Sequence, residues 1–293
     1  MERLQTSTLP FSLKAYLILT KPGIIMGNVI TATGGFALAA RGQFDFWLFL
    51  AMLEGLALIV ASACVFNNYI DREADKKMAR TRNRPLVKGT ISATTALIYA
   101  TLLGLFGIFI LAKFTNLLAL AVALTGFVVY VALYSFVKYR TVHGTLIGSI
   151  AGAAPPVVGY TAVTGCFDLA ALIIFAIIVM WQMPHFYAIA IYRVEDYAAA
   201  SIPILPIKKG MRATKIQMLI YVVTFMIVSC MLSFFSFTNM IYLIVSILVG
   251  MTWLTLSVKG FRCKCDQSWA RMMFMFSLVV VMAQSIVIPF SVL

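Results

Sequence analysis

The chain contains 293 residues, of which 62% are hydrophobic and 11% are charged, and its mean hydropathy is +0.98. Soluble domains are about half apolar and about a quarter charged, so this balance excludes a soluble globular protein and indicates an integral membrane protein. The net charge of +13 is explained by basic loops beside membrane helices, so it gives no reason to expect a nucleic-acid partner.

Apolar stretches of about 20 residues, enough to cross about 30 Å of hydrocarbon as a helix, recur along the whole chain. They lack the alternation of membrane strands, so we predict an all-α integral membrane protein and not a barrel. No soluble domain or linker interrupts them, and we treat residues 1–293 as a single polytopic domain. The nine predicted transmembrane helices cover residues 17–40, 47–70, 91–112, 116–137, 144–164, 169–192, 216–236, 239–258 and 270–291.

Lys and Arg are distributed unequally between the loops that these spans define. Alternate loops hold all of the 23 Lys and Arg residues except Arg41 and Lys113. Positive charge in short loops stays on the cytoplasmic side, so we predict a cytoplasmic N-terminus and a C-terminus outside. No transit peptide is apparent, which favours a bacterial plasma (inner) membrane. The cysteines show no disulfide framework, and we expect Cys263 and Cys265 to be free thiols on the reducing side.

The second span leads into the stretch NNYIDREADKKMARTRNRP, which begins at Asn67. Asn67, Asp71 and Asp75 are four residues apart, so a continued helix presents all three on one stripe. Two carboxylates on one face repel each other unless a cation lies between them. Mg²⁺ suits this position, because it takes oxygen ligands from one or two carboxylates together with substrate phosphates.

Arginines follow these acids directly, at Arg80, Arg82 and Arg84. Planar guanidinium groups match phosphate oxygens, so acids followed by arginines predict a site for Mg²⁺ and a diphosphate. The alternative is a solvated loop whose acids merely offset its bases. We expect that behaviour of Arg72 and Glu73, which lie off the stripe.

The fourth span ends in YSFVK, where Lys138 is either a phosphate contact or a topology anchor. In the fifth span, Gly144, Gly148 and Gly152 form a small-residue stripe that allows close helix packing. Pro155 and Pro156 follow, and they are expected to kink or break this helix.

Ionisable groups inside the spans are functional candidates by default. His185 lies beside Pro184 in WQMPHF, and is either a ligand contact or a histidine bonded to a neighbouring helix. Glu54, in the second span, is either functional or satisfied by Gln182 or a hydroxyl. His143 is expected at the membrane interface.

The motifs together resemble the intramembrane prenyltransferases of the ubiquinone-biosynthesis type. N-x-x-x-D-x-x-x-D from Asn67, Y-x-x-x-K from Tyr134 and the acidic pair Glu195 and Asp196 are similar to the motifs of that family. LTKPGI, NNYIDREADKKMARTRNRPL, IGSIAGAAPPVVGY, WQMPHFYAIAIYR and EDYAAASIPILP resemble its haem-farnesylating branch more closely, over nearly the whole chain.

The resemblance implies transfer of the farnesyl group of farnesyl diphosphate to a vinyl group of haem B, with addition of water, giving haem O. It implies a Mg²⁺ cofactor and a lipid-bilayer location, and leaves open a homo-oligomer or contact with haem-handling enzymes. His185 is the implied haem contact. The implied metal-binding residues are Asn67, Asp71, Asp75 and Asp196, of which the three aspartates are catalytic. The implied diphosphate-binding residues are Asn67, Lys21, Arg80, Arg84 and Lys138.

One departure concerns the second acidic motif. The wider family has D-x-x-x-D there, whereas Tyr192 precedes Asp196 by four residues and Ala200 follows it by four. A second metal on this side therefore requires Glu195 as a substitute ligand. Two rival functions remain open: a prenyltransferase with a quinone precursor or other aromatic acceptor, and a multipass transporter of an amphipathic anion.

Overall fold

The computed structural model describes residues 12–293, and these residues form helices with no β-sheet. Residues 1–11, which belong to the predicted domain 1–293 and include Arg3, lie outside the described residues. Nine helical spans of the described chain are long and apolar enough to cross a membrane, as predicted. They are α2 (Pro22–Ala40), α3 (Phe46–Lys77), α4 (Ala93–Phe114), α5 with η1 and α6 (Leu117–Val137), α7 with α8 (Gly144–Thr164), α9 (Leu169–Tyr192), α11 (Leu205–Phe234), α12 with η2 (Met240–Arg262) and α13 with η3 (Asp266–Phe290).

The first span begins later than the sequence predicts. A separate helix, α1 (Leu13–Thr20), precedes it, and Lys21 takes a left-handed conformation with φ of 53° between the two helices. Pro22 then occupies the first position of α2, where its missing N–H costs no hydrogen bond. The chain therefore turns at Lys21, directly before the first apolar span.

The seventh span begins earlier than predicted, at Leu205 in place of residue 216. Gly210, with φ of 84° and ψ of 166°, interrupts the helical geometry inside α11. Glycine tolerates this conformation because it has no Cβ. The short segment before Gly210 therefore belongs to the loop side of the protein, and the apolar helix follows it.

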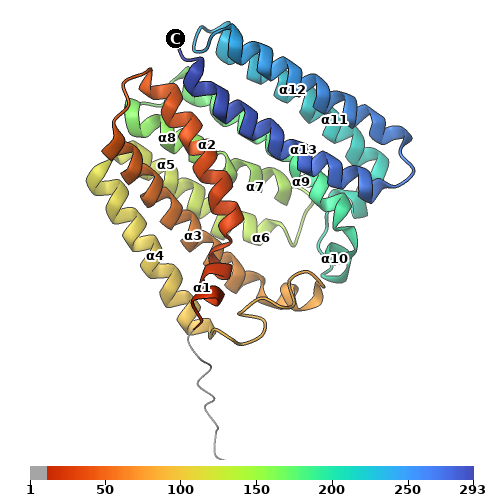
Figure 1. Cartoon of the computed structure of the whole chain (residues 1–293). Helices are drawn as coiled ribbons and strands as arrows, with labels where there is room; N and C mark the ends of the chain where they lie inside the picture. The colour runs from red at the N-terminus through yellow and green to blue at the C-terminus, as the bar shows by residue number, and fades with distance from the viewer. Residues whose placement is uncertain (1–11) are drawn as a thin grey trace, which may run out of the picture.

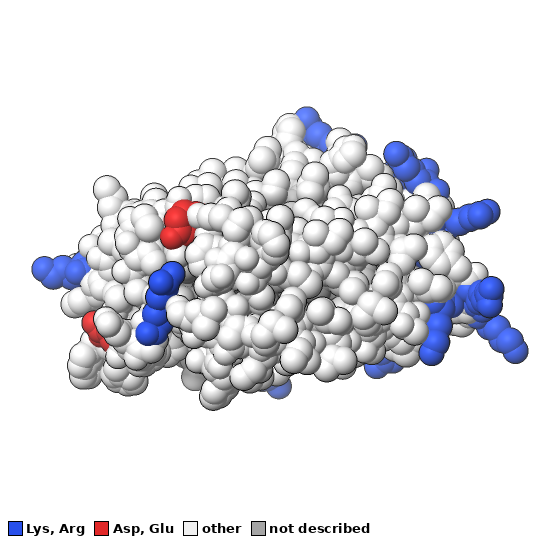
Figure 2. Space-filling view, turned by 90° about the horizontal axis from the view of Figure 1, so that it is seen from above, with Lys and Arg blue, Asp and Glu red and all other residues white. Residues whose placement is uncertain are grey.

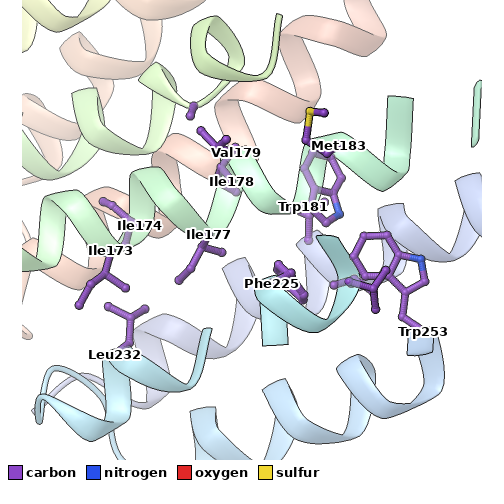
Figure 3. Close-up of a cluster of buried hydrophobic side chains, with 14 of the residues drawn as sticks. Ile173, Ile174, Ile177, Ile178, Val179, Trp181, Met183, Phe225, Leu232 and Trp253 are labelled. Carbon is purple, nitrogen blue, oxygen red and sulfur yellow. The ribbon is translucent and has the colours of Figure 1, made fainter. Parts of the chain in front are cut away.

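The spans pack into two groups around separate cores (Figure 1). In the first group α3 packs on α4 and α2 packs on α8, and in the second α9 packs on α11 and α13, with α12 outside them. Side chains of α9 belong to the second core, where Ile173 and Ile174 lie toward Leu232 and Trp181 lies toward Phe225 and Trp253 (Figure 3). The two groups meet where α2 crosses α13 and α8 crosses α9.

The fifth span breaks at Ala153 into α7 (Gly144–Gly152) and α8 (Ala154–Thr164), as the prolines predict. Pro155 and Pro156 lie in the first turn of α8, where proline fits a helix without disrupting it. α8 then approaches α2 so closely that a Cβ on Gly35 would lie 1.9 Å from the Pro156 carbonyl oxygen. Only glycine permits this contact.

Most of the surface is apolar, as expected of a chain surrounded by lipid. The face viewed from above is almost free of charged side chains, and the Lys and Arg residues visible there lie mainly at its edges (Figure 2). An exposed apolar surface of this extent would cause aggregation in water, so it supports a membrane environment.

Two loops on the side of the molecule where α1 lies come together. The loop 78–92 after α3 and the segment containing α10 (Val194–Ala199) lie side by side (Figure 1). Met78, Ala200 and Ile202 form a small buried cluster there, with Tyr139 and Tyr197 packed against it. This cluster fixes the position of α10 over the end of α3.

Thiol accessibility tests the predicted orientation. Cys166 and Cys265 are both exposed and free, and they lie in loops on opposite sides of the predicted membrane. We expect a membrane-impermeant maleimide to label Cys166 on intact spheroplasts, and to label Cys265 only after permeabilisation. A Cys166→Ser variant should lose the external label, and the reverse pattern of labelling would invert the topology.

Candidate active site

The predicted stripe of oxygen ligands forms as the sequence indicates. α3 continues without interruption to Lys77, so Asn67, Asp71 and Asp75 lie on one face of its last turns. Asn67 is 3% exposed and Asp75 is 1% exposed. These polar groups therefore lie inside the protein, where each needs a partner.

Asn67 is bound by Lys21, at the turn between α1 and α2. Lys21 Nζ donates to Asn67 Oδ1 at 2.6 Å, and Tyr130 Oη donates to the same oxygen at 3.3 Å. Burial lowers the pKa of Lys21 to about 8. Left-handed backbone is uncommon for a residue other than glycine and often marks a functional position. An anion placed here would favour the charged amine.

The amide nitrogen of the Asn67 side chain is unpaired within the described part of the chain. This Nδ2 atom is buried and has no hydrogen-bond partner among the described residues. A buried donor without a partner costs about 1–3 kcal/mol. Because Lys21 fixes the oxygen of this amide, the free nitrogen is available to an acceptor such as a phosphate oxygen.

Asp71 is bound by Lys138, which the sequence left open as a phosphate contact or an anchor. Lys138 Nζ lies 2.5 Å and 2.6 Å from the two carboxylate oxygens of Asp71, and Tyr139 Oη donates to Oδ1 at 2.8 Å. Burial lowers the pKa of Lys138, while the Asp71 charge opposes that shift. Burial also raises the pKa of Tyr139, so this phenol stays a hydrogen-bond donor. Lys138 is therefore in direct contact with the acid stripe of α3.

The position of Lys138 depends on an irregular helix. α5 (Leu117–Val128) passes into the π-helical turn η1 (Val129–Tyr134) and then into α6 (Ser135–Val137). Turns of this kind are frequent at functional sites. The rings of Tyr130 and Tyr134 stack there with centroids 5.4 Å apart, and Lys138 Nζ lies 4.9 Å from the Tyr134 ring.

The glycine stripe of α7 packs on this irregular turn. A Cβ on Gly144 would lie 2.7 Å from the Lys138 Cα, and one on Gly148 would lie 3.1 Å from the Tyr134 ring. Both contacts are possible only because glycine has no side chain. The predicted packing role is confirmed, and it places Tyr134 and Lys138 against the site.

Asp75 is bound by Arg84, from the loop after α3. Arg84 Nη1 lies 2.6 Å from Asp75 Oδ2, and Thr81 Oγ1 donates to the Asp75 carbonyl oxygen at 3.1 Å. Arg80 and Arg82 are exposed. Of the three arginines in MARTRNRP, only Arg84 reaches an acid of the stripe.

The second loop contributes Asp196, whose Oδ1 accepts a hydrogen bond from the Arg80 backbone N–H at 3.4 Å. Asp196 therefore lies against the first loop, across from α3. Glu195 points elsewhere, because its Oε1 accepts from Gln267 Nε2 of α13 at 3.3 Å. The structure gives no support to Glu195 as a substitute ligand.

The donor set fits a hard cation held jointly with a substrate anion. Within residues 12–293, no group of three or more His, Cys, Asp or Glu side chains is arranged to hold a metal. Carboxylate and amide oxygens in line suit Mg²⁺ when phosphate oxygens and waters complete its shell. The unpaired Asn67 nitrogen could also donate a hydrogen bond to an oxygen of such an anion. The predicted metal ligands Asn67, Asp71, Asp75 and Asp196 stay a prediction.

Three residues of this region were missed by the sequence analysis: Tyr130, Tyr139 and Tyr197. Tyr130 precedes Tyr134 by four residues and Tyr139 follows Lys138, so helical spacing around YSFVKYR was an available signal. Nothing in the sequence distinguished Tyr197.

The remaining candidates lie apart from the stripe. His185 Nδ1 lies 2.7 Å from Ser277 Oγ of α13, and its ring stacks on Trp181. Glu54 is exposed and makes no hydrogen bond or ion pair with the described residues, so the alternative in which Gln182 or a hydroxyl is its partner is not the one that the structure shows. His143 is exposed at the start of α7.

The site and the fold agree with a known enzyme family. Residues 28–279 match the family described as the UbiA prenyltransferase family. The chain belongs to the UbiA prenyltransferase family. It is therefore an enzyme of the prenyltransferase class, as the motifs predict.

Solved structures of this UbiA type share the fold. One described as digeranylgeranylglyceryl phosphate synthase in membranes has a TM-score of 0.77 at 19% identity, covering 95% of this chain and 99% of its own. A UbiA homologue from Archaeoglobus fulgidus bound to GPP and Mg²⁺ has a TM-score of 0.72 at 15% identity, covering 94% and 99%.

Among curated proteins, the protoheme IX farnesyltransferase of Protochlamydia amoebophila is 54% identical over 94% of this chain and 98% of its own. The protein of the same name from Edwardsiella ictaluri is 52% identical over 96% of each.

The packing of Gly144 generates a prediction for this UbiA-family site. Gly144→Ala places a methyl group against the Lys138 backbone, so it should destabilise the protein by about 1–3 kcal/mol and raise KM for the prenyl diphosphate. Thermal unfolding in detergent and steady-state kinetics measure the two effects. Gly27→Ala is the matched control, because a Cβ there meets nothing within 4 Å; equal behaviour of the two variants would contradict the proposed contact.

Proposed function

We propose that this UbiA-family enzyme transfers the farnesyl group of farnesyl diphosphate to a vinyl group of haem B, with addition of water, to give haem O. The observation that carries the proposal is the identity of about half of all residues, over nearly full length, with proteins named protoheme IX farnesyltransferase. The geometry of the α3 stripe supports it, because that region is suited to an allylic diphosphate.

The charges of the site favour a diphosphate. Lys21, Arg84 and Lys138 face the amide of Asn67 and the carboxylates of Asp71 and Asp75. With Arg80 and Asp196 of the two loops included, the site has four cations and three acids, so the cations exceed the acids by one. In the proposed complex the diphosphate oxygens replace the acids as partners of these cations. Arg80, at the mouth of the same loop, is the further diphosphate contact that we propose.

Mg²⁺, held by Asn67, Asp71, Asp75 and Asp196, would neutralise charge on the diphosphate and make it a better leaving group. The protein's own cations perform the same task. As the C1–O bond of the farnesyl group breaks, Lys138 and Arg84 stabilise the negative charge that develops on the departing oxygen. The Asn67 amide nitrogen donates to a phosphate oxygen and fixes its orientation.

We propose that carbon–carbon bond formation and addition of water follow the departure of diphosphate. The allylic cation at C1 accepts the electron pair of the haem vinyl group, forming a carbon–carbon bond and moving the cation to the carbon beside the ring. Water adds there and loses a proton, which gives the hydroxyethylfarnesyl side chain. The stacked rings of Tyr130 and Tyr134 lie beside Lys138, and aromatic faces of this kind stabilise a nearby cation.

The proposed location is the bacterial plasma membrane, with the diphosphate site on the cytoplasmic side. The nine helical spans of residues 12–293 that are long and apolar enough to cross a membrane, together with the bacterial relatives, support a multi-pass membrane enzyme. A diphosphate is soluble and charged, so a site at the basic ends of the helices receives it from water while the farnesyl chain enters the apolar interior.

A direct assay tests the proposed reaction. Purified protein in detergent is incubated with haem B, farnesyl diphosphate and Mg²⁺, with and without EDTA, and the haem is analysed by mass spectrometry. We expect a hydroxyethylfarnesyl adduct that EDTA abolishes. Mg²⁺-dependent loss of the diphosphate without a haem adduct would move the acceptor to a quinone precursor or other aromatic compound, and inertness toward both would favour a transporter.

Variants of the stripe test the proposed metal and diphosphate site. Asp71→Asn and Asp75→Asn should each lower turnover by about 100-fold or more, because they remove charge that acts on the leaving group. Circular dichroism should show unchanged helix content. Glu73→Gln is the matched control on the exposed side of α3 and should retain activity. Full activity in both aspartate variants would refute this site.

A further inference from the structure

The helices α9 and α13 form an antiparallel seam whose polar contacts follow one register. Because the helices run in opposite directions, residues nearer the C-terminus of α9 contact residues nearer the N-terminus of α13. The contacts along the seam are Trp181 Nε1 to the Ser277 carbonyl oxygen at 2.7 Å, His185 to Ser277 Oγ, Arg271 over the Tyr192 ring, and Gln267 to Glu195. The seam therefore runs from the partly buried His185 to the end of α9 at Tyr192.

Hydrogen bonding along the seam sets the tautomer of His185. A serine hydroxyl has one hydrogen, and Ser277 Oγ donates it to the Phe274 carbonyl oxygen at 2.5 Å. His185 Nδ1 must then be the donor in its 2.7 Å contact with Ser277 Oγ. Its Nε2 consequently carries the lone pair and makes no hydrogen bond within the described residues. A neutral imidazole with a free Nε2 is the form that binds a haem iron.

Two guanidinium groups meet at the membrane end of the seam. Arg193 lies 4.4 Å and Arg271 lies 5.7 Å from the centroid of the Tyr192 ring. Neither forms an ion pair with an acid in residues 12–293, and Glu195, the neighbouring acid, is bonded to Gln267. Two positive charges beside one ring repel each other, and an anion bound between them would relieve that repulsion. Guanidinium groups match the geometry of carboxylates in particular.

The spacing relates these two features. Tyr192 lies seven residues after His185, which is two turns along the same face of α9 and about 10 Å. This separation is comparable with the reach from the centre of a porphyrin to its propionate carboxylates. Phe274 lies between Arg271 and Ser277 on α13, so its ring borders His185 on the side toward Tyr192. Trp181, one turn before His185 on α9, stacks on the imidazole from the other direction.

We propose that Arg193 and Arg271 bind the two propionate carboxylates of the acceptor haem, with Nε2 of His185 directed at its iron. The inference rests on the proposed function, because it requires haem B as acceptor. It assigns the acceptor an orientation: the carboxylates lie at the membrane edge and the porphyrin ring lies deeper along the α9–α13 seam. The shared ligand chemistry is an oxygen anion, which a phospholipid headgroup also supplies, so the test separates the two.

The test compares protohaem with its dimethyl ester, which keeps the iron and vinyl groups but lacks both carboxylate charges. Binding to the intact protein is followed by the Soret shift, and farnesylation by KM and kcat. Wild-type protein should bind the diacid at least about tenfold more tightly than the ester, since a hydrogen bond to a charged group is worth about that factor. Arg193→Gln and Arg271→Gln should each weaken diacid binding, leave ester binding unchanged and so reduce the preference.

Two variants serve as controls. Arg262→Gln removes an exposed arginine of η2 and should keep the wild-type preference. His185→Ala should reduce the Soret shift with both compounds and keep the diacid preference, because it removes the proposed iron contact and leaves both arginines in place. It should affect haem use more than binding of farnesyl diphosphate.

The outcomes that overturn the inference are distinct from failure of the proposed function. A wild-type diacid preference in both arginine variants, or equal weakening of diacid and ester, would overturn it while haem farnesylation still stood. Loss of phosphatidylglycerol binding in these variants, with the diacid preference intact, would assign the arginines to a lipid headgroup and also overturn it. A wild-type protein that neither binds nor farnesylates haem would overturn the proposed function and the inference together.

Discussion

The pairing of the α3 oxygen groups with three cations is the interaction on which the rest of the site depends. The cations come from separate parts of the chain: Lys21 from the turn before α2, Arg84 from the loop after α3, and Lys138 from beyond the π-helical turn. Holding them together requires the break at Lys21, the fold of the first loop and the irregular end of the fourth span. All three departures from regular helix therefore serve to bring a cation to the α3 oxygen groups.

The energetics of these pairs indicate why they are kept. A buried ion pair contributes little net stability compared with apolar packing, whereas removal of one partner costs about 3–5 kcal/mol. Asp75, at 1% exposure, belongs to this class. These buried ion pairs add little to the stability of the fold, and loss of either partner would destabilise it. A ligand that takes the place of one partner explains their presence better than stability does. The unpaired Asn67 nitrogen supports the same view.

The membrane separates polar from apolar functions along the helices. Apart from Glu54, the charged groups of α3, α6 and α9 lie at or beside the helix ends, and the spans between them are lined by apolar and aromatic side chains. A reaction that joins a water-soluble leaving group to two large apolar partners suits this division. In our proposal the two substrates approach from different helices, the diphosphate along α3 and the haem along the α9–α13 seam.

The sequence by itself determined the class, the number of membrane spans, the stripe at Asn67, Asp71 and Asp75, and the break at Pro155, because hydrophobic length, helical spacing and proline geometry are local properties. It did not determine which cation faces which oxygen. Lys138 remained ambiguous, Tyr139 was missed, and Glu195 proved to face α13, since these outcomes depend on contacts between residues far apart in the chain. Only the tertiary structure decided them, because long side chains at helix ends reach several alternative partners, and the packing of α7, α10 and α13 selects one.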